Sequence, residues 1–181
     1  QTPWEAKEEF LRFFAGQRER CGSLVLVANS IGAYFSMCAS AETLIDRAYF
    51  ISPIVDMEKL ICKMMAWAGV TEQELAEKSE IPTEFGETLS WNYLCYVREH
   101  PLHWRVPTCI LYGGRDSLTS PETVTAFAER TGAELTVMPD GEHWFHTQRQ
   151  LQFWTAGSHH GSINKRLPPC AAQDKTEEKL K

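Results

Sequence analysis

Residues 23–38 read SLVLVANSIGAYFSMC, a short apolar stretch typical of a β-strand followed by a helix-forming stretch that starts with small residues. Ser30 stands at the break between the two. A serine in a tight strand-to-helix turn presents its hydroxyl at the top of a sheet, and the backbone N–H groups that follow point to the same place. The stretch therefore predicts a nucleophile elbow, usually written G-x-S-x-G.

Short apolar segments alternate with helical patterns along most of the chain. The predicted strands span residues 24–28, 48–52, 108–112 and 135–138, and the predicted helices span 3–18, 31–41, 121–131 and 144–155. Strands that alternate with helices imply a parallel sheet covered on both faces. The expected fold class is α/β, with about four parallel strands flanked by helices.

Residues 53–106 interrupt this alternation. Apolar residues recur there with helical spacing at Met57, Leu60, Ile61, Met64, Met65 and Ala68, and a second helix is expected at about 85–99. Residues 81–83 read as the connection between them. We expect a helical insert over the sheet edge, whose Met and aromatic residues either line an apolar pocket or pack as an ordinary core.

Polar side chains follow the last two predicted strands. The strand at 108–112 runs into Gly113-Gly114-Arg115-Asp116, and the strand at 135–138 runs into Pro139-Asp140-Gly141-Glu142-His143. The carboxyl ends of parallel strands meet at one edge of a sheet, so Asp116 and His143 are expected beside Ser30. A serine nucleophile needs a base and a group that orients the base.

The order of these motifs resembles the α/β-hydrolase superfamily. The resemblance covers about residues 1–155 and rests on Ala28-Asn29-Ser30-Ile31-Gly32, Tyr112-Gly113-Gly114-Arg115-Asp116 and Gly141-Glu142-His143-Trp144. It implies Ser30 as nucleophile, His143 as general base and acid, and Asp116 as the group that holds the imidazole. It also implies the Ile31 N–H as an oxyanion donor and a cap at about 53–106.

Two departures from the family pattern bear on activity. Ala28 replaces the first elbow glycine, a change that a close strand–helix approach often tolerates. The family sheet has four more strands before this point, and the loop after its third strand supplies the other oxyanion donor. We therefore expect a truncated α/β-hydrolase fold that is weakly active or inactive alone, with strand 24–28 as an exposed edge able to pair with another strand.

Each assignment has an alternative. Ser30 is also compatible with a plain helix N-cap, Asp116 with a brace for its turn, and His143 with a surface histidine. Asp56 is a rival acid because some family members place theirs after the preceding strand, and His146 is a weaker candidate base. The function alternatives are a serine hydrolase acting on a small ester, thioester or amide, and a non-catalytic hydrolase-like fragment that binds a ligand or protein partner.

The substrate side of the site is less defined by sequence. We expect a small-molecule acyl substrate, and we assign substrate contacts to Asn29, Met57, Met64 and Trp144. No metal is expected, because neither C-x-x-C nor H-E-x-x-H occurs. No cofactor is expected either.

Composition narrows the class of protein. The net charge of −6 and the absence of a basic, aromatic-interleaved stripe disfavour nucleic acid as a partner. No apolar run approaches the roughly 20 residues of a membrane span. The six cysteines show no disulfide framework, so we expect reduced thiols and a cytoplasmic protein.

Residues 156–181 change character at Gly157-Ser158-His159-His160, and we expect a disordered tail or the remnant of an added tag there.

Overall fold

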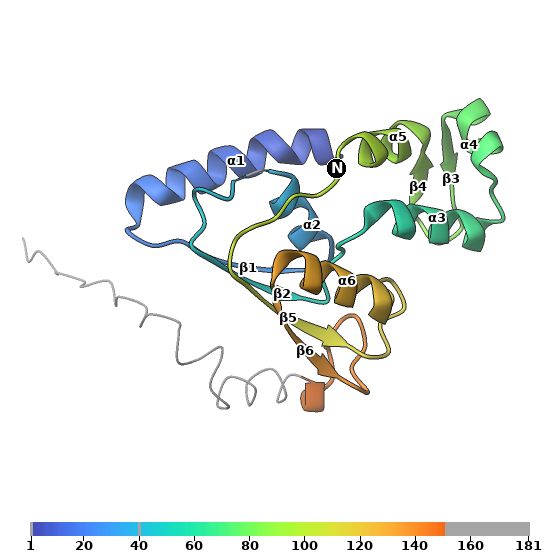
Figure 1. Cartoon of the computed structure of the whole chain (residues 1–181). Coiled ribbons are helices and arrows are strands. Elements are labelled where there is room, and N and C mark those ends of the chain that lie inside the picture. The colour runs from blue at the N-terminus through green and yellow to red at the C-terminus, as the bar shows by residue number, and fades with distance from the viewer. Residues whose placement is uncertain (1, 40, 151–181) are drawn as a thin grey trace, which may run out of the picture. The chain divides into compact units, whose positions relative to one another are not determined.

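Four parallel strands form the central sheet of the computed structural model, which describes residues 2–39 and 41–150 of the 181-residue chain (Figure 1). The strands run in the order β1-β2-β5-β6 and span β1 (Val25–Asn29), β2 (Arg47–Ile51), β5 (Thr108–Gly113) and β6 (Glu134–Met138). All three pairings are parallel, with β1 bonded to β2 from Val25 to Asn29. The α/β class and the positions of all four strands are confirmed.

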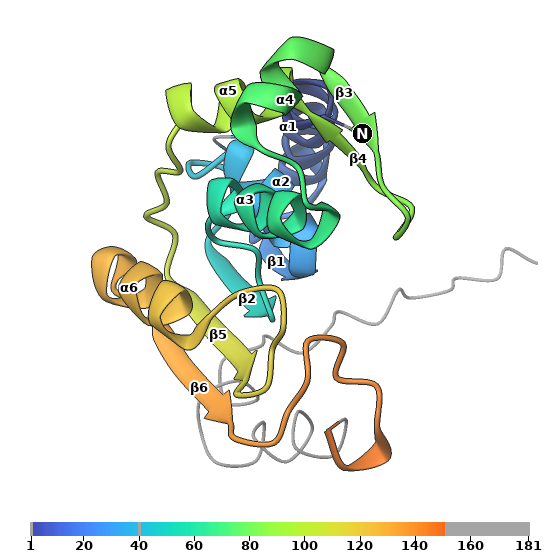
Figure 2. The ribbon, with the colours of Figure 1, turned by 90° about the vertical axis from the view of Figure 1, so that its right-hand side faces the viewer.

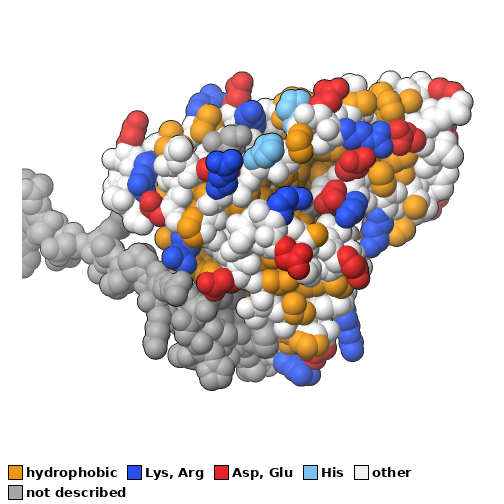
Figure 3. Space-filling view, in the orientation of Figure 1, with side chains coloured by type: hydrophobic (Ala, Val, Ile, Leu, Met, Phe, Trp, Pro, Cys, Tyr) orange, Lys and Arg blue, Asp and Glu red, His pale blue; other side chains and the backbone are white. Residues whose placement is uncertain are grey.

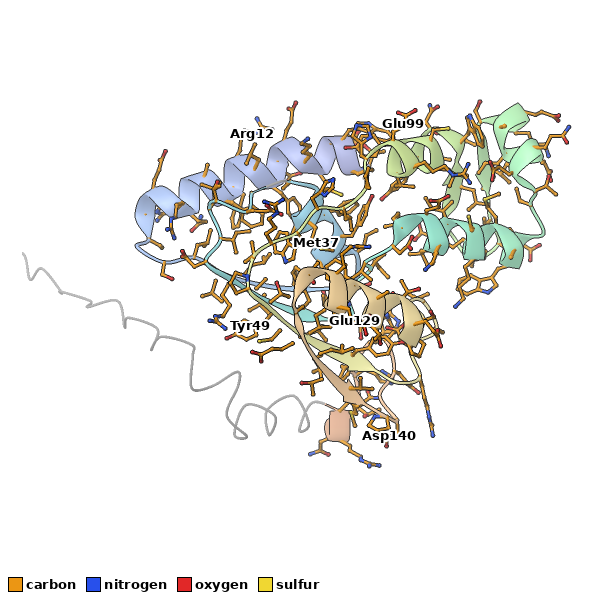
Figure 4. The ribbon with its side chains drawn as sticks, in the orientation of Figure 1. Arg12, Met37, Tyr49, Glu99, Glu129 and Asp140 are labelled. Carbon is orange, nitrogen blue, oxygen red and sulfur yellow. The ribbon has the colours of Figure 1, made fainter. Side chains whose placement is uncertain are left out.

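Three helices cover one face of this sheet: α1 (Pro3–Arg20), α2 (Ser30–Cys38) and α6 (Pro121–Thr131). Their buried side chains share one core with alternate residues of the strands, including Phe50, Ile110 and Tyr112. Met37 of α2 lies in this core beneath α1 and is almost fully buried (Figure 4). The sequence predicted helices on both faces, whereas α1, α2 and α6 all lie on the same one.

Both ends of α6 carry residues that are typical of helix termini. The Ser120 hydroxyl accepts a hydrogen bond from the Thr123 N–H, Pro121 occupies the first position, and Gly132 follows the last turn with φ 69°. A left-handed residue at this position suits glycine because it carries no Cβ. The predicted bounds of this helix, 121–131, are confirmed.

The insert contains more elements than the sequence predicted. It holds α3 (Met57–Ala68), α4 (Glu72–Lys78), an antiparallel hairpin of β3 (Glu80–Pro82) and β4 (Thr88–Ser90), and α5 (Trp91–Glu99). Figure 2 shows these elements gathered beside α1 and α2, away from β6. The insert is therefore mainly helical, as expected, but it also contains a short β-hairpin that the sequence did not predict.

The predicted helix at 85–99 is wrong in its first half. Residues 88–90 form β4, and α5 begins only at Trp91, after Ser90 caps it by accepting the Tyr93 N–H. Gly86 adopts φ 90°, which turns the hairpin and prevents a helix from crossing it. The predicted connection at 81–83 is likewise mostly strand, because β3 includes its first two residues.

The apolar stripe of α3 anchors the insert. Met57, Leu60, Ile61 and Met65 are buried in a second core that also includes Tyr34 of α2. Ala68 is exposed, so the last position of the predicted stripe is wrong. Cys62 is exposed as well, because it lies beside the stripe rather than within it.

Residues up to Phe145 form one compact unit, and the described residues from His146 onward belong to a separate one. The predicted helix at 144–155 starts later than expected, since only residues 148–150 of its described part are helical. Its remainder and the expected tail at 156–181 lie outside the described residues.

Strand β1 lies at the edge of the sheet within the described residues. It bonds to β2 along its whole length, and the side chain of Val27 is 56% exposed. Pairing of this strand with another remains a prediction.

The described cysteines carry free thiols, and no described helix is long and apolar enough to cross a membrane.

Candidate active site

Ser30 occupies a strained turn between β1 and α2. Its φ is 47°, a left-handed value that residues with a Cβ rarely adopt, and Asn29 rather than Ser30 is the N-cap of α2. The Ser30 carbonyl oxygen accepts the Ile54 N–H at 3.1 Å, which ties the turn to the segment after β2. Strain of this kind concentrates at functional sites when the surrounding structure holds it. The turn has the geometry of a nucleophile elbow.

His143 reaches Ser30 from the loop that follows β6. Its Nε2 lies 2.7 Å from the Ser30 Oγ, although 113 residues separate the two in sequence. His143 is only 5% exposed. The histidine side chain is therefore a buried partner of the serine rather than a surface group.

Asp116 completes the arrangement from the turn after β5. Its Oδ2 lies 2.7 Å from the His143 Nδ1, and its side chain is fully buried. Its Oδ1 accepts the N–H groups of Leu118 at 2.7 Å and Thr119 at 3.1 Å. A carboxylate can only accept, so Nδ1 carries the ring proton, Nε2 presents its lone pair, and the Ser30 hydroxyl donates to it.

The acid turn and the histidine loop are joined through the backbone. The Gly114 N–H donates to the Met138 carbonyl at 2.8 Å, and the Arg115 N–H donates to the Gly141 carbonyl at 2.9 Å. These bonds fix the two loops in register, so Asp116 and His143 meet without relying on their side chains alone. Sequence reasoning missed this contact, although the glycines on both loops were a visible signal.

Tyr112 braces the acid turn from within the core. Its hydroxyl donates to the Thr119 carbonyl at 2.7 Å. Burial, with smaller effects from Asp116 and Glu122, raises the pKa of Tyr112 to about 12. The hydroxyl thus remains a donor over the neutral pH range. The Thr119 hydroxyl in turn donates to the Pro53 carbonyl at 3.3 Å, linking the turn to the segment after β2.

Ile31 and Asn29 flank the serine. Ile31 lies in the first turn of α2, where a backbone N–H has no acceptor within its own helix, and its side chain is 43% exposed. Asn29 is exposed, and its side chain makes no capping bond. Their roles as oxyanion donor and substrate contact stay predictions.

The other predicted substrate residues lie in different surroundings. Trp144 is 66% exposed, and its ring stands edge-to-face against His143 with centroids 5.0 Å apart. Met57 is buried in the core of the insert, and Met64 packs against the same core. The structure thus brings Trp144 to the serine–histidine pair and shows the two methionines in packing contacts of the insert.

The rival residues have other partners. Asp56 caps α3 by accepting the Lys59 N–H at 3.0 Å and pairs with the Lys59 ammonium at 3.4 Å. The carboxylate bonded to His143 is therefore Asp116. His146 belongs to the separate unit. The described residues contain no group of three or more side chains suited to hold a metal ion.

Comparison with solved structures defines the class of fold. A hydrolase-class protein from Agrobacterium vitis S4 superposes with a TM-score of 0.68 at 16% identity, over 88% of this chain and 68% of its own. Est1E from Butyrivibrio proteoclasticus gives 0.58 at 17% identity, over 76% and 60%. Mouse alpha/beta hydrolase domain-containing protein 10 gives 0.60 at 14%, over 76% and 61%.

These similarities show that the chain has the α/β-hydrolase fold. It spans about 60–68% of the length of these structures. No protein-family model matches the sequence, and no curated protein is significantly similar to it.

Proposed function

We propose that this chain carries the catalytic centre of a serine hydrolase that acts on a small ester, thioester or amide through an acyl-enzyme. The observation that carries the proposal is the pair of 2.7 Å contacts that join Ser30 to His143 and His143 to Asp116. Nucleophile, base and orienting carboxylate are recognised by such geometry rather than by sequence position.

The contacts support a defined order of proton transfers. Ser30 Oγ attacks the acyl carbon while His143 Nε2 takes the hydroxyl proton, and Asp116 stabilises the imidazolium that forms. The imidazolium then gives its proton to the leaving group, which departs and leaves an acyl-serine. Water attacks this ester with His143 again acting as base, and the acid product leaves as the serine is restored.

Stabilisation of the oxyanion is the weaker part of the site. We assign one donor among the described residues, the Ile31 N–H at the start of α2. One such donor is worth about 3–4 kcal/mol, or about 10²–10³ in rate. We therefore expect Ser30 to react with activated acyl or phosphonyl reagents while turnover of ordinary esters by this chain stays slow.

The surroundings of Ser30 favour apolar acyl or aromatic groups. Exposed Ile31 and Trp144 side chains flank the serine–histidine pair and offer apolar surface without a fixed charge. Among the structural neighbours, Est1E has been solved with ferulic acid bound, an aromatic acid. A small ester or thioester with an apolar or aromatic acyl group is accordingly the substrate class that we propose.

Labelling with a fluorophosphonate probe tests the proposal directly. The parent chain should be labelled, Ser30→Ala should not be, and His143→Ala should be labelled much more slowly because no group takes the proton. Ser23→Ala is the matched control, since Ser23 is an exposed serine before β1, and it should label like the parent. Peptide mapping should place the adduct on Ser30.

An unlabelled but folded parent chain would contradict the proposal. That result would favour the alternative of a non-catalytic hydrolase-like protein that binds a ligand or partner. Labelling that survives Ser30→Ala would likewise reject Ser30 as the nucleophile.

A further inference from the structure

A cavity of about 530 Å³ lies between α3, α6 and the connection from α5 to β5. None of Ser30, Asp116 and His143 lines it, so it is separate from the proposed catalytic centre. Its volume falls within the range of small-molecule sites. The charged side chains in its lining are Lys59, Arg98, Arg105, Arg130, Asp56 and Glu58.

The two carboxylates of the lining are already engaged by two of its cations. Arg98 Nε donates to Glu58 at 2.7 Å, and its terminal nitrogens bind both oxygens of Glu72 at 2.7 and 2.8 Å. Lys59 pairs with Asp56. Together these two cations and three carboxylates carry a net charge of −1, so any positive charge that a ligand meets must come from other residues.

Arg105 and Arg130 differ from Arg98 and Lys59 because no described carboxylate engages them. Neither forms a hydrogen bond or ion pair with any residue that the structure describes, although the Arg130 guanidinium lies 5.6 Å from the centroid of the Phe127 ring. They come from separate elements, the connection before β5 and the last turn of α6. Both residues are exposed, so their guanidinium groups are open to solvent and to a ligand.

Two histidines from the same connection add ring N–H groups to the cavity. The ring of His100 stacks on Tyr96 with centroids 4.1 Å apart, and its Nδ1 donates to the Tyr96 carbonyl at 2.9 Å. His103 also lines the cavity and has no polar partner among the described residues. Figure 3 shows histidine side chains close to Lys and Arg side chains on this face of the molecule.

We propose that this cavity binds a small phosphate-bearing molecule and that Arg105 and Arg130 hold its phosphate oxygens. A guanidinium presents planar paired donors that match phosphate, and the charge of two free arginines matches a phosphate dianion better than a single carboxylate. Of the apolar residues in the lining, Leu102 is half-buried and Ala126 is exposed, and these two offer a surface for an organic part of the ligand. This site is distinct from the acyl-transfer centre.

Calorimetric titration of the full chain with inorganic pyrophosphate, and separately with ADP, tests the proposal. We expect saturable binding of both, and an Arg105→Gln/Arg130→Gln double variant should bind at least about tenfold more weakly, because each lost contact is a charge-assisted hydrogen bond. The matched control is Arg12→Gln/Arg20→Gln, which removes the same charge from exposed positions on α1. Arg12 is labelled on this helix in Figure 4. The control should bind like the parent.

Further readouts separate this site from the proposed catalytic centre. Ser30→Ala should bind both probes with unchanged affinity even if fluorophosphonate labelling fails. Backbone amide shifts on titration should centre on residues 98–105 and on the end of α6, which decides the location even if the double variant folds poorly. Absence of saturable binding up to about 5 mM of either probe would overturn the proposal, as would an equal loss of affinity in the control pair.

Discussion

Gly113 and Gly141 approach so closely that a Cβ added to Gly113 would lie 2.6 Å from the Gly141 carbonyl oxygen and 2.8 Å from that of Glu142. Gly113 ends β5 just before the acid turn, and Gly141 precedes His143 in the loop after β6. The close approach allows the two loops to exchange backbone hydrogen bonds. Two residues without side chains thus set the separation of Asp116 and His143.

Gly113→Ala should therefore damage both stability and the proposed catalytic contacts. The new methyl group meets backbone atoms that cannot rotate away, so the loops must separate. We expect a loss of about 1–3 kcal/mol in the free energy of unfolding, as for other overpacked sites. Fluorophosphonate labelling should slow in parallel. Urea denaturation and labelling kinetics measure the two effects.

The control for this change is Gly16→Ala, where an added Cβ would meet nothing within 4 Å. Gly16 lies within α1, so alanine should raise the unfolding free energy by about 0.5–1 kcal/mol and leave labelling unchanged. Equal stability of Gly113→Ala and the parent would contradict the close-packing argument.

Asp116→Asn should slow labelling while leaving the fold largely intact. Asparagine cannot accept on both sides as the carboxylate does, so either the His143 ring or the Leu118 and Thr119 amides lose an acceptor. The histidine then favours the tautomer that cannot take the serine proton. We expect a reduction of about 10³–10⁴ in the rate of labelling. The Asp56→Asn variant should label at the parent rate, because Asp56 caps α3 instead. Equal rates in the two variants would reject Asp116 as the orienting acid.

The sequence predicted the sheet and the meeting of three polar residues for a simple reason. Each strand is a short apolar run in a parallel sheet, and a residue just after such a strand must lie at its carboxyl edge. This reasoning places Ser30, Asp116 and His143 at one edge without any knowledge of side-chain contacts. The structure shows the three within hydrogen-bonding distance there.

The parts that sequence did not predict depend on contacts that no periodicity records. Strands β3 and β4 have three residues each, too short to show alternation. Helix α4 buries only Leu75 and relies on the Thr71 cap, so it has no apolar stripe. The brace on Asp116 comes from two backbone N–H groups, whose direction depends on the turn rather than on residue type.

Asp46, which contacts the residue just before the edge strand β1, should make the free energy of unfolding depend on pH. Its Oδ2 accepts the Leu24 N–H at 2.7 Å, just before β1, and also pairs with Arg18. The hydrogen bond from the Leu24 backbone, aided by Arg18, lowers the pKa of the Asp46 carboxyl below its ordinary value. A carboxyl whose pKa is lowered on folding stabilises the fold above its unfolded pKa of about 3.9, and this stabilisation is lost as pH falls through the folded value.

Asp46→Asn should accordingly be less stable than the parent at pH 7, and the difference should shrink as the pH is lowered below about 4. Thermal unfolding of both proteins across this range measures the difference. Glu19→Gln is the control, because Glu19 is an exposed acid near the end of α1. A difference between Asp46→Asn and the parent that does not change with pH would show that the charge of Asp46 is not its cause.

The Ser30→Gly variant distinguishes the cost of the backbone strain at Ser30 from the proposed catalytic role of its hydroxyl. Ser30 holds φ 47° with a Cβ, at a cost of about 1–2 kcal/mol that glycine does not incur. Glycine also loses more backbone entropy on folding, by about 0.5–1 kcal/mol, so the net gain in stability should be small but positive. Labelling should disappear because the hydroxyl is gone. Ser23→Gly, at an exposed position before β1, should gain no stability and should label normally. A Ser30→Gly protein clearly less stable than the parent would mean that the bond from Ser30 to His143 outweighs the backbone strain.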